Sequence, residues 1–272
     1  MKHPLTRRVL RTLRMAATIL LVGVAAADTT TEHWDCGAGP QAAPAAAGRL
    51  LVLPGVGNTT FHLAGFVERA QRQLPEFAID VRPWGTPFLT LHNLRAHARN
   101  VATAQRLAAE VAAWRRAHPD EKIYVVGYSG GGGMVTLMTA ALPDDVAIDR
   151  LILVAPAISP DFPLAERVLP HVREFVVNYA SDRDLQVGWG TRTFGTIDRE
   201  YMRSAGAVGF ELQHERLLQH YWSLADRPYG HHGNHLSYLN RRWQDARLLP
   251  ALDLALTAEA VRARWATTCK EK

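Results

Sequence analysis

A five-residue segment near the middle of the chain combines a hydroxyl nucleophile with closely spaced glycines. Residues 127–131 have the sequence Gly-Tyr-Ser-Gly-Gly, which fits the pattern G-x-S-x-G of a serine held on a sharp turn. Side chains at the two outer glycines would collide with neighbouring backbone. The Ser129 hydroxyl would then stand clear of the turn, near the N-terminus of the next helix, which stabilises negative charge. We therefore expect Ser129 to be a catalytic nucleophile.

The residues around this segment supply the strand and the helix that such a turn requires. Residues 123–126 are an apolar run typical of a buried strand, and residues 130–141 are small and apolar enough to form a tightly packed helix. A glycine-rich turn of this kind could instead bind a phosphate. A phosphate-binding loop needs a lysine after its last glycine, however, and here Met134 follows Gly133.

Short apolar runs alternate with helical patterns from residue 49 onward. The runs are continuous rather than alternating, which is typical of strands covered on both faces in a parallel sheet. Strand–helix alternation of this kind predicts an α/β fold with right-handed crossovers. The predicted strands are residues 50–53, 77–81, 123–126, 151–154 and 175–177, and the predicted helices are residues 100–117, 130–141, 164–169 and 248–265.

Over residues 49 to about 250, this order of elements around Ser129 resembles the α/β-hydrolase family. Residues 190–196, with Ala205-Gly206 and Gly209-Phe210 after them, are similar to exported bacterial members of that family. The resemblance implies a mostly parallel sheet flanked by helices and a catalytic triad in the chain order Ser, acid, His. Many members insert a cap after the strand that corresponds to residues 151–154. Only about twenty residues separate that run from the next one, so we expect no large cap domain.

The resemblance places the acid in the turn after residues 175–177. Asp184 matches the family's habit of an acid followed by apolar residues, and we expect it to be the acid of the triad. Asp182, beside Arg183, is the competing residue in the same turn. Asp161 occupies the acid position that some lipases use one strand earlier.

The resemblance places the base in a loop before the final helix, and residues 229–236 contain three histidines. His235 fits best because it follows a glycine-rich turn and precedes an apolar helical run, and His231 and His232 stay as alternatives. With His214 and His220 nearby, the histidines also raise the possibility of a metal site. No His-Glu-x-x-His motif occurs, so we predict neither a metal nor a cofactor.

The oxyanion hole requires two backbone N–H groups aimed at the developing negative charge. Gly130, directly after the nucleophile, is expected to supply one. The other is expected from Val56, in the loop after the first predicted strand. Pro54 stands where many family members have histidine, but Val56 contributes only its main chain.

The segment between Asp184 and His235 is longer than one strand–helix unit needs and is rich in aromatic residues. We expect at least half of these residues to pack in the core and the remainder to line an apolar pocket. They are Trp189, Phe194, Tyr201, Phe210, Tyr221 and Trp222.

The N-terminal residues carry the charge excess of the chain. Five of the 31 Lys and Arg residues and none of the 26 Asp and Glu residues lie within residues 1–27. The remainder therefore carries 26 residues of each sign, which gives the body of the protein no charge excess for binding nucleic acid.

A positive segment at residues 2–14 and an apolar run at residues 15–27 that ends in three alanines predict a signal peptide. As a helix, the apolar run would span about 20 Å, less than the roughly 30 Å of a bilayer core, so a retained membrane anchor is the weaker interpretation. Residues 6–11 also fit a twin-arginine motif, which leaves the export route open. We predict a signal peptide (residues 1–27), a leader (residues 28–48) and one domain (residues 49–272), exported to the periplasm or secreted.

The two cysteines, Cys36 and Cys269, lie near opposite ends of the exported chain. Export permits disulfides, and the termini of a compact domain often lie close together. A Cys36–Cys269 disulfide is therefore one hypothesis, and two free thiols are the other.

The predicted function is that of an exported serine hydrolase that cleaves small-molecule carboxylic esters, as a monomer or a weakly associated protein. A serine peptidase, thioesterase or amidase would use the same residues. A non-catalytic α/β-hydrolase-like binding protein is the alternative of a different class. Such proteins typically lack a member of the triad, whereas this chain has candidates for all three.

Overall fold

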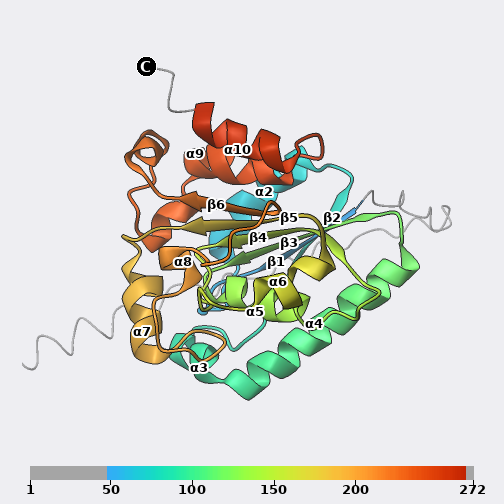
Figure 1. Cartoon of the computed structure of the whole chain (residues 1–272), viewed down its shortest axis with the longest axis horizontal. Coiled ribbons are helices and arrows are strands. Elements are labelled where there is room, and N and C mark those ends of the chain that lie inside the picture. Colours follow the sequence, from blue (N-terminus) through green and yellow to red (C-terminus); the bar gives the residue numbers. More distant parts are fainter. Residues whose placement is uncertain (1–47, 268–272) are drawn as a thin grey trace, which may run out of the picture. The chain divides into compact units, whose positions relative to one another are not determined.

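A computed structural model of the protein describes residues 48–267, with side chains to residue 266. Its centre is a six-stranded sheet in the order β2-β1-β3-β4-β5-β6, in which every neighbouring pair is parallel (Figure 1). This arrangement confirms the predicted α/β fold. The strands are β1 (Gly48–Leu53), β2 (Phe77–Val81), β3 (Lys122–Tyr128), β4 (Ile148–Val154), β5 (Val172–Ala180) and β6 (Leu217–Tyr221).

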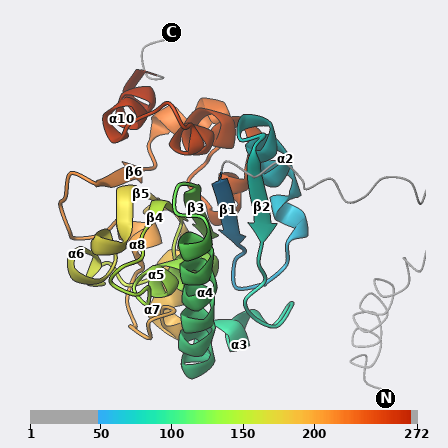
Figure 2. The same ribbon diagram turned by 90° about the vertical axis from the view of Figure 1, so that its right-hand side faces the viewer.

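Helices cover both faces of the sheet (Figures 1 and 2). One face carries α4 (His97–Ala117), α5 (Gly130–Thr139) and α6 (Leu164–Arg167), and the other carries α2 (Ala64–Gln73), α9 (Arg241–Trp243) and α10 (Ala258–Thr267). The short helices α3 (Thr90–Arg95), α7 (Thr191–Phe194) and α8 (Ala205–Val208) lie toward the carboxyl edge of the sheet.

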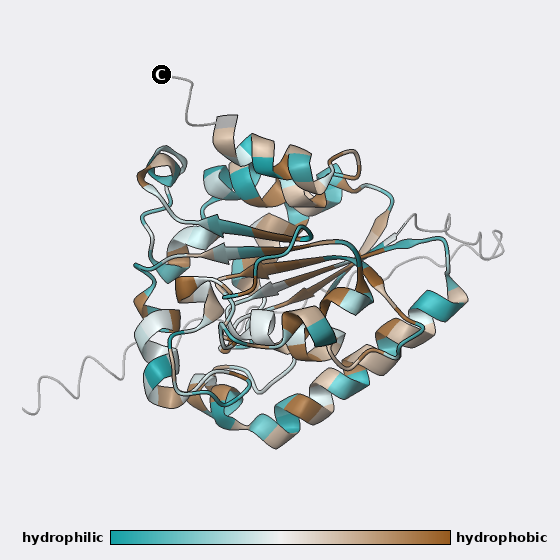
Figure 3. Cartoon of the chain, in the orientation of Figure 1, coloured by the Kyte–Doolittle hydropathy of each residue, from teal (hydrophilic) through white to brown (hydrophobic). Residues whose placement is uncertain are grey.

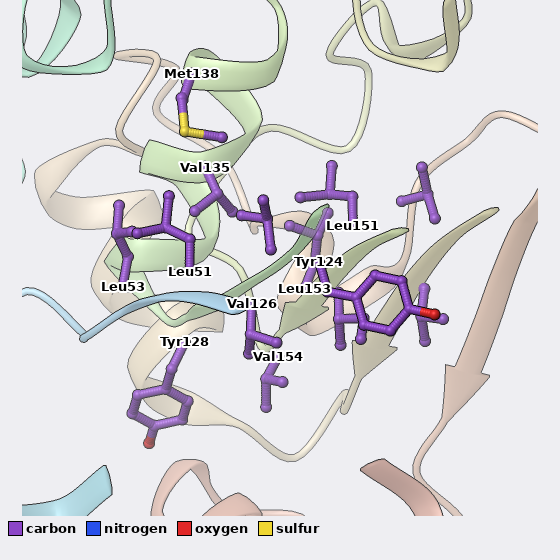
Figure 4. Packing of buried hydrophobic residues seen from close by; sticks show 14 of the residues in the cluster. Leu51, Leu53, Tyr124, Val126, Tyr128, Val135, Met138, Leu151, Leu153 and Val154 are labelled. Carbon is purple, nitrogen blue, oxygen red and sulfur yellow. The ribbon is translucent and has the colours of Figure 1, made fainter. Parts of the chain in front are cut away.

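The core consists of two apolar layers, one on each side of the strands. Figure 4 shows Leu51 and Leu53 on the same side as Val135 and Met138 of α5, and Val126 on the opposite side. The strands are accordingly apolar along most of their length, whereas polar residues gather on the outward faces of the helices (Figure 3). This burial on both faces is the physical reason for the continuous apolar runs in the sequence.

The five predicted strands lie within β1 to β5, but β6 was not predicted. Its sequence, Leu-Leu-Gln-His-Tyr, begins buried and ends exposed at the edge of the sheet, so it lacks a continuous apolar run. Between β4 and β5 the chain forms only α6 and a 3₁₀ turn (Leu169–His171), with no large cap.

The prediction of one helix over residues 248–265 was wrong. Residues 244–252 form a π turn and a 3₁₀ turn, and the terminal helix begins only at Ala258. Helical backbone continues through Pro250 and ends at Asp253, which is extended (φ −68°, ψ 117°), so the apolar pattern of residues 248–265 spans two separate helical segments.

Three of the sequence-based predictions concern residues that the structure does not describe. These are the signal peptide, the leader up to residue 47, and the pairing of Cys36 with Cys269. Among residues 48–267, no helix has both the length and the apolar character needed to cross a bilayer.

Candidate active site

Ser129 occupies the tight turn between β3 and α5. Its backbone has φ 56° and ψ −122°, a conformation that is unfavourable for a residue with a side chain. Hydrogen bonds hold it there: its N–H donates to the Val154 carbonyl (2.8 Å), and its carbonyl accepts from the N–H of Ala157 (3.0 Å). The hydroxyl-bearing residue is thus fixed at the carboxyl edge of the sheet by its neighbouring strands.

The glycines on either side of Ser129 are required by space. A Cβ at Gly127 would lie 2.5 Å from the carbonyl oxygen of Gly131. A Cβ at Gly131 would collide with the carbonyl oxygens of Leu53 and Pro54. The turn can therefore approach both α5 and the end of β1 only with glycine at these two positions.

His235 and Asp184 lie in contact although 51 residues separate them in the chain. Nδ1 of His235 is 2.6 Å from Oδ2 of Asp184, and because a carboxylate can only accept, the imidazole N–H donates. The other Asp184 oxygen accepts from the N–H groups of Gln186 (3.0 Å) and Val187 (3.3 Å). Asp184 is fully buried, so these donors replace the water that would otherwise solvate its charge.

Tyr128 connects the serine turn to this pair. Its hydroxyl donates to the backbone carbonyl of His235 (2.9 Å), and the two rings lie 5.0 Å apart. Burial raises the pKa of Tyr128 well above its ordinary value, so the hydroxyl keeps its proton as a donor. Ser129, next in the chain, and His235 are therefore linked through a single residue.

The competing acids lie elsewhere. Asp182 and Asp161 are both exposed, and the Asp182 backbone carbonyl accepts a hydrogen bond from the Arg203 side chain. Neither carboxylate is paired with a histidine among the described residues.

The competing histidines are also separated from Asp184. His232 is exposed. His231 is buried against the rings of Tyr238 and Trp243, and its Nδ1 accepts from the N–H of Gly233 (3.0 Å). Burial lowers the pKa of His231 to about 4, so it is neutral near neutral pH.

The two expected oxyanion donors lie side by side. A Cβ at Gly130 would collide with the Val56 side chain and would lie 3.2 Å from the Val56 nitrogen. Gly130 is the first residue of α5, where an N–H has no partner within the helix. The main chain of Val56 thus lies next to Gly130, the residue that follows Ser129.

Ser129 opens into a cavity of about 470 Å³. One wall comes from α3 and the other from residues 186–194. None of the described residues that line it is Asp, Glu, Lys or Arg. The lining consists of Val56, Thr90, Leu91, Leu94, Ser129, Ala157, Gln186, Val187, Gly190, Thr191 and Phe194.

The expectation for the aromatic residues was wrong. Of the six between Asp184 and His235, only Phe210 is buried, whereas Trp189, Tyr201 and Tyr221 are exposed. The reason is their position: Trp189 lies on a short helical turn at the surface, and Tyr221 lies at the exposed end of the edge strand β6. Phe194 does line the cavity, as the remainder of the group was expected to do.

Two features of this region escaped the sequence analysis. The wall formed by Leu91 and Leu94 lies on a six-residue helix that was not predicted, although its leucines are three residues apart. The second is a further buried pair: Nε2 of His220 lies 3.2 Å from Oδ1 of Asp226, which also accepts from Nε of Arg247 at 2.9 Å.

The described part of the chain contains no group of three His, Cys, Asp or Glu side chains that could hold a metal ion. His220 and His231 are each engaged with protein groups: His220 with Asp226, and His231 with the N–H of Gly233.

The sequence profile of the family described as "Serine aminopeptidase, S33" matches residues 44–203, which is more than half of the chain and includes Ser129 and Asp184. No curated protein matches the chain.

Several solved structures are similar at low identity. The thioesterase RedJ from the prodiginine biosynthetic pathway of Streptomyces coelicolor is 17% identical, with 80% of this chain and 91% of RedJ covered and a TM-score of 0.42. An acetylxylan esterase is 11% identical (80% and 98% covered, TM-score 0.42). A cutinase-like protein from Cryptococcus sp. is 14% identical (77% and 97% covered, TM-score 0.40). We draw no functional conclusion from likenesses at this level.

The profile match covers β1 to β5, the serine turn and the turn that carries Asp184. The chain belongs to the serine aminopeptidase S33 family of α/β-hydrolases, and it is a serine hydrolase by family.

Proposed function

We propose that this serine hydrolase cleaves uncharged carboxylic esters through Ser129, His235 and Asp184. The observation that carries the proposal is the buried 2.6 Å contact between His235 and Asp184, on the same sheet edge as a serine held in a strained turn. A histidine oriented by a buried carboxylate is the arrangement that activates a hydroxyl nucleophile.

In the proposed reaction, His235 takes the Ser129 hydroxyl proton as the serine oxygen attacks the ester carbonyl carbon. The carbonyl oxygen becomes an oxyanion, which the N–H groups of Val56 and Gly130 stabilise. His235 then gives its proton to the departing alkoxide, and an alcohol leaves. Water repeats the sequence on the acyl-enzyme, releasing the carboxylic acid and restoring Ser129. Asp184 holds the imidazole orientation and offsets its positive charge.

The composition of the cavity favours an ester over an aminopeptide substrate. An aminopeptidase must bind the ammonium group of a peptide N-terminus, and burying that charge is costly without an opposite charge. The described residues of the cavity lining carry no carboxylate, but they do include aliphatic and aromatic side chains. Its volume lies in the range of sites that bind small organic molecules, about 300–1,000 Å³.

Labelling with a fluorophosphonate tests the nucleophile. We expect one phosphonyl group per molecule on the peptide that contains Ser129, and none in Ser129→Ala or in heat-denatured protein. Absence of label from the folded native protein would contradict the serine mechanism and favour a non-catalytic binding protein.

Turnover of matched substrates tests the class of bond. We expect hydrolysis of p-nitrophenyl butyrate, and at least about 100-fold slower hydrolysis of leucine p-nitroanilide. The reverse preference would show an aminopeptidase, the activity for which the family is named. Equal loss of both activities in Ser129→Ala would show that one site performs both.

We also propose that residues 1–27 direct export and that Cys36 and Cys269 form a disulfide in the exported protein. The support is the charged and apolar pattern of residues 2–27 and the oxidising compartment that export implies. Mass spectrometry of exported protein under non-reducing conditions should find a new N-terminus after Ala27 and a Cys36–Cys269 cross-linked peptide. An intact N-terminus would contradict the cleaved signal peptide, and two free thiols would contradict the disulfide.

A further inference from the structure

Gly190 lies in the wall of the catalytic cavity, between the turn that follows Asp184 and helix α7. Its backbone has φ −60° and ψ −46°, an ordinary helical conformation that any residue adopts. Glycine therefore has no conformational advantage here, and it destabilises helical backbone relative to alanine.

Space does not require glycine at this position either. A Cβ built on Gly190 meets no atom within 4 Å, whereas one on Gly127 or Gly131 would collide with backbone. Gly206 is similarly constrained, because a Cβ there would lie 2.6 Å from the Pro156 nitrogen. Gly190 thus differs from the structurally required glycines, since open space lies beside its Cα and the residue itself lines the cavity.

The cavity lining is uncharged and mostly apolar, with Thr90, Gln186 and Thr191 as its polar members besides Ser129. Leu91 and Leu94 of α3 line the same cavity, and α3 packs against α7. Phe194, one helical turn after Gly190, lines the cavity and is 41% exposed, and Leu91 is 44% exposed. These two side chains extend the apolar wall toward solvent, so an extended chain that begins at Ser129 could continue between α3 and α7.

We propose that Gly190 determines substrate specificity by keeping a channel open for an apolar acyl chain longer than acetyl. The acyl chain lies between Leu91 and Leu94 on one side and Gly190 and Phe194 on the other. This inference rests on the proposed esterase function and adds the substrate class: esters of uncharged, medium-length aliphatic acids.

The test narrows the channel in two steps, with Gly190→Ala and Gly190→Leu. The probes are p-nitrophenyl acetate, butyrate and octanoate. The readout is the ratio of kcat/KM for octanoate to kcat/KM for acetate in each variant, relative to the same ratio in wild type. We expect this ratio to fall a few-fold with alanine and at least about tenfold with leucine, the scale of one methylene in an apolar pocket.

Gly65→Ala is the matched control. Gly65 lies in helix α2 outside the cavity, and a Cβ there meets only the end of the Arg69 side chain, at 3.5 Å. This variant makes the same chemical change in a helix, and its acetate-to-octanoate ratio should equal that of wild type. A shifted ratio in Gly65→Ala would show that the ratio responds to helix stability, which would overturn the inference.

The outcomes separate the two levels of the proposal. Failure of the wild-type protein to hydrolyse all three esters would refute the proposed function itself. Wild-type activity with an unchanged ratio in Gly190→Leu would refute only the role of Gly190. An equal loss on acetate and octanoate in Gly190→Leu, with fluorophosphonate labelling retained, would also refute it, because the substitution would then not discriminate by chain length.

Discussion

Two histidine–aspartate pairs with a fully buried carboxylate occur among the described residues, and they differ in what surrounds the carboxylate. In the pair formed by His235 and Asp184, the carboxylate accepts from the imidazole and from two backbone N–H groups. In the pair formed by His220 and Asp226, the carboxylate also has the buried guanidinium of Arg247 at 2.9 Å. Only the first pair is attached to the serine turn, through Tyr128.

The presence of Arg247 gives Asp226 a structural function. Burial by itself raises the pKa of Asp226. Hydrogen bonds and charge from His220, the Ser223 N–H and Arg247 outweigh this effect and lower the pKa to about 2. Its charge is therefore already balanced within the protein. Asp184 has no cationic side chain among its described hydrogen-bond partners, so a positive charge that forms on His235 is the charge it can balance. A histidine–aspartate contact alone thus does not identify a catalytic pair.

The largest expected effect is on catalytic activity, and it should occur only when the aspartate of the first pair, Asp184, is substituted. Asp184→Asn should lower kcat/KM for p-nitrophenyl butyrate by about 10³–10⁴-fold, because a neutral amide cannot balance the imidazolium charge. With its oxygen held by the Gln186 and Val187 N–H groups, its NH₂ would donate to the imidazole and favour the wrong tautomer. Thermal unfolding followed by circular dichroism should stay close to wild type. Near wild-type turnover in this variant would contradict the proposed role of Asp184.

The second prediction is that substitution of Asp226, in the other pair, mainly lowers the free energy of unfolding. Asp226→Asn should lower the free energy of unfolding by about 3–5 kcal/mol, because it leaves Arg247 as a buried charge without its full partner. Urea denaturation measures this effect. The folded fraction should retain kcat/KM within about threefold, and a larger loss of activity in fully folded protein would place Asp226 in the catalytic site.

The third prediction concerns His231, which belongs to the loop between the two pairs. Its folded pKa of about 4 lies below the ordinary 6.5, so the unfolded chain binds more protons between these values. The contribution of neutral His231 to the free energy of unfolding is therefore fully present above about pH 6.5. It decreases by about 3 kcal/mol as the pH falls to 4. In His231→Asn, urea denaturation should show a shallower loss of stability across this window. An unchanged slope would contradict the assignment.

The smallest expected effect tests the link between the serine turn and His235. Tyr128→Phe removes the hydroxyl that donates to the His235 carbonyl and keeps the ring. We expect the activation free energy to rise by about 1 kcal/mol, which slows the reaction roughly fivefold. We expect the loss in kcat, with KM unchanged, since Tyr128 positions His235 and does not line the cavity. A change in KM alone would instead indicate a contact with substrate.

Local sequence was enough to predict the elements whose apolar residues form a continuous run or a helical stripe. Five of the strands and the helices after Ser129 and before β3 were recognisable because continuous apolar runs and helical periodicity record the burial of each segment. Segments with a weaker pattern escaped, although the edge strand β2 was predicted. These include β6, with its polar end, and α3, which is only six residues long.

The parts of the candidate site that are local in the chain were predictable, and the parts that depend on distant contacts were not. The sequence by itself determined the fold class and the position of Ser129, because a strand, a tight glycine turn and a helix are consecutive in the chain. It left three aspartates and three histidines as possible partners. Only the tertiary structure decided that His235 meets Asp184, that His231 is buried among aromatic rings, and that α3 forms a cavity wall. Those contacts join residues that are far apart in the chain, and their formation depends on how whole elements pack.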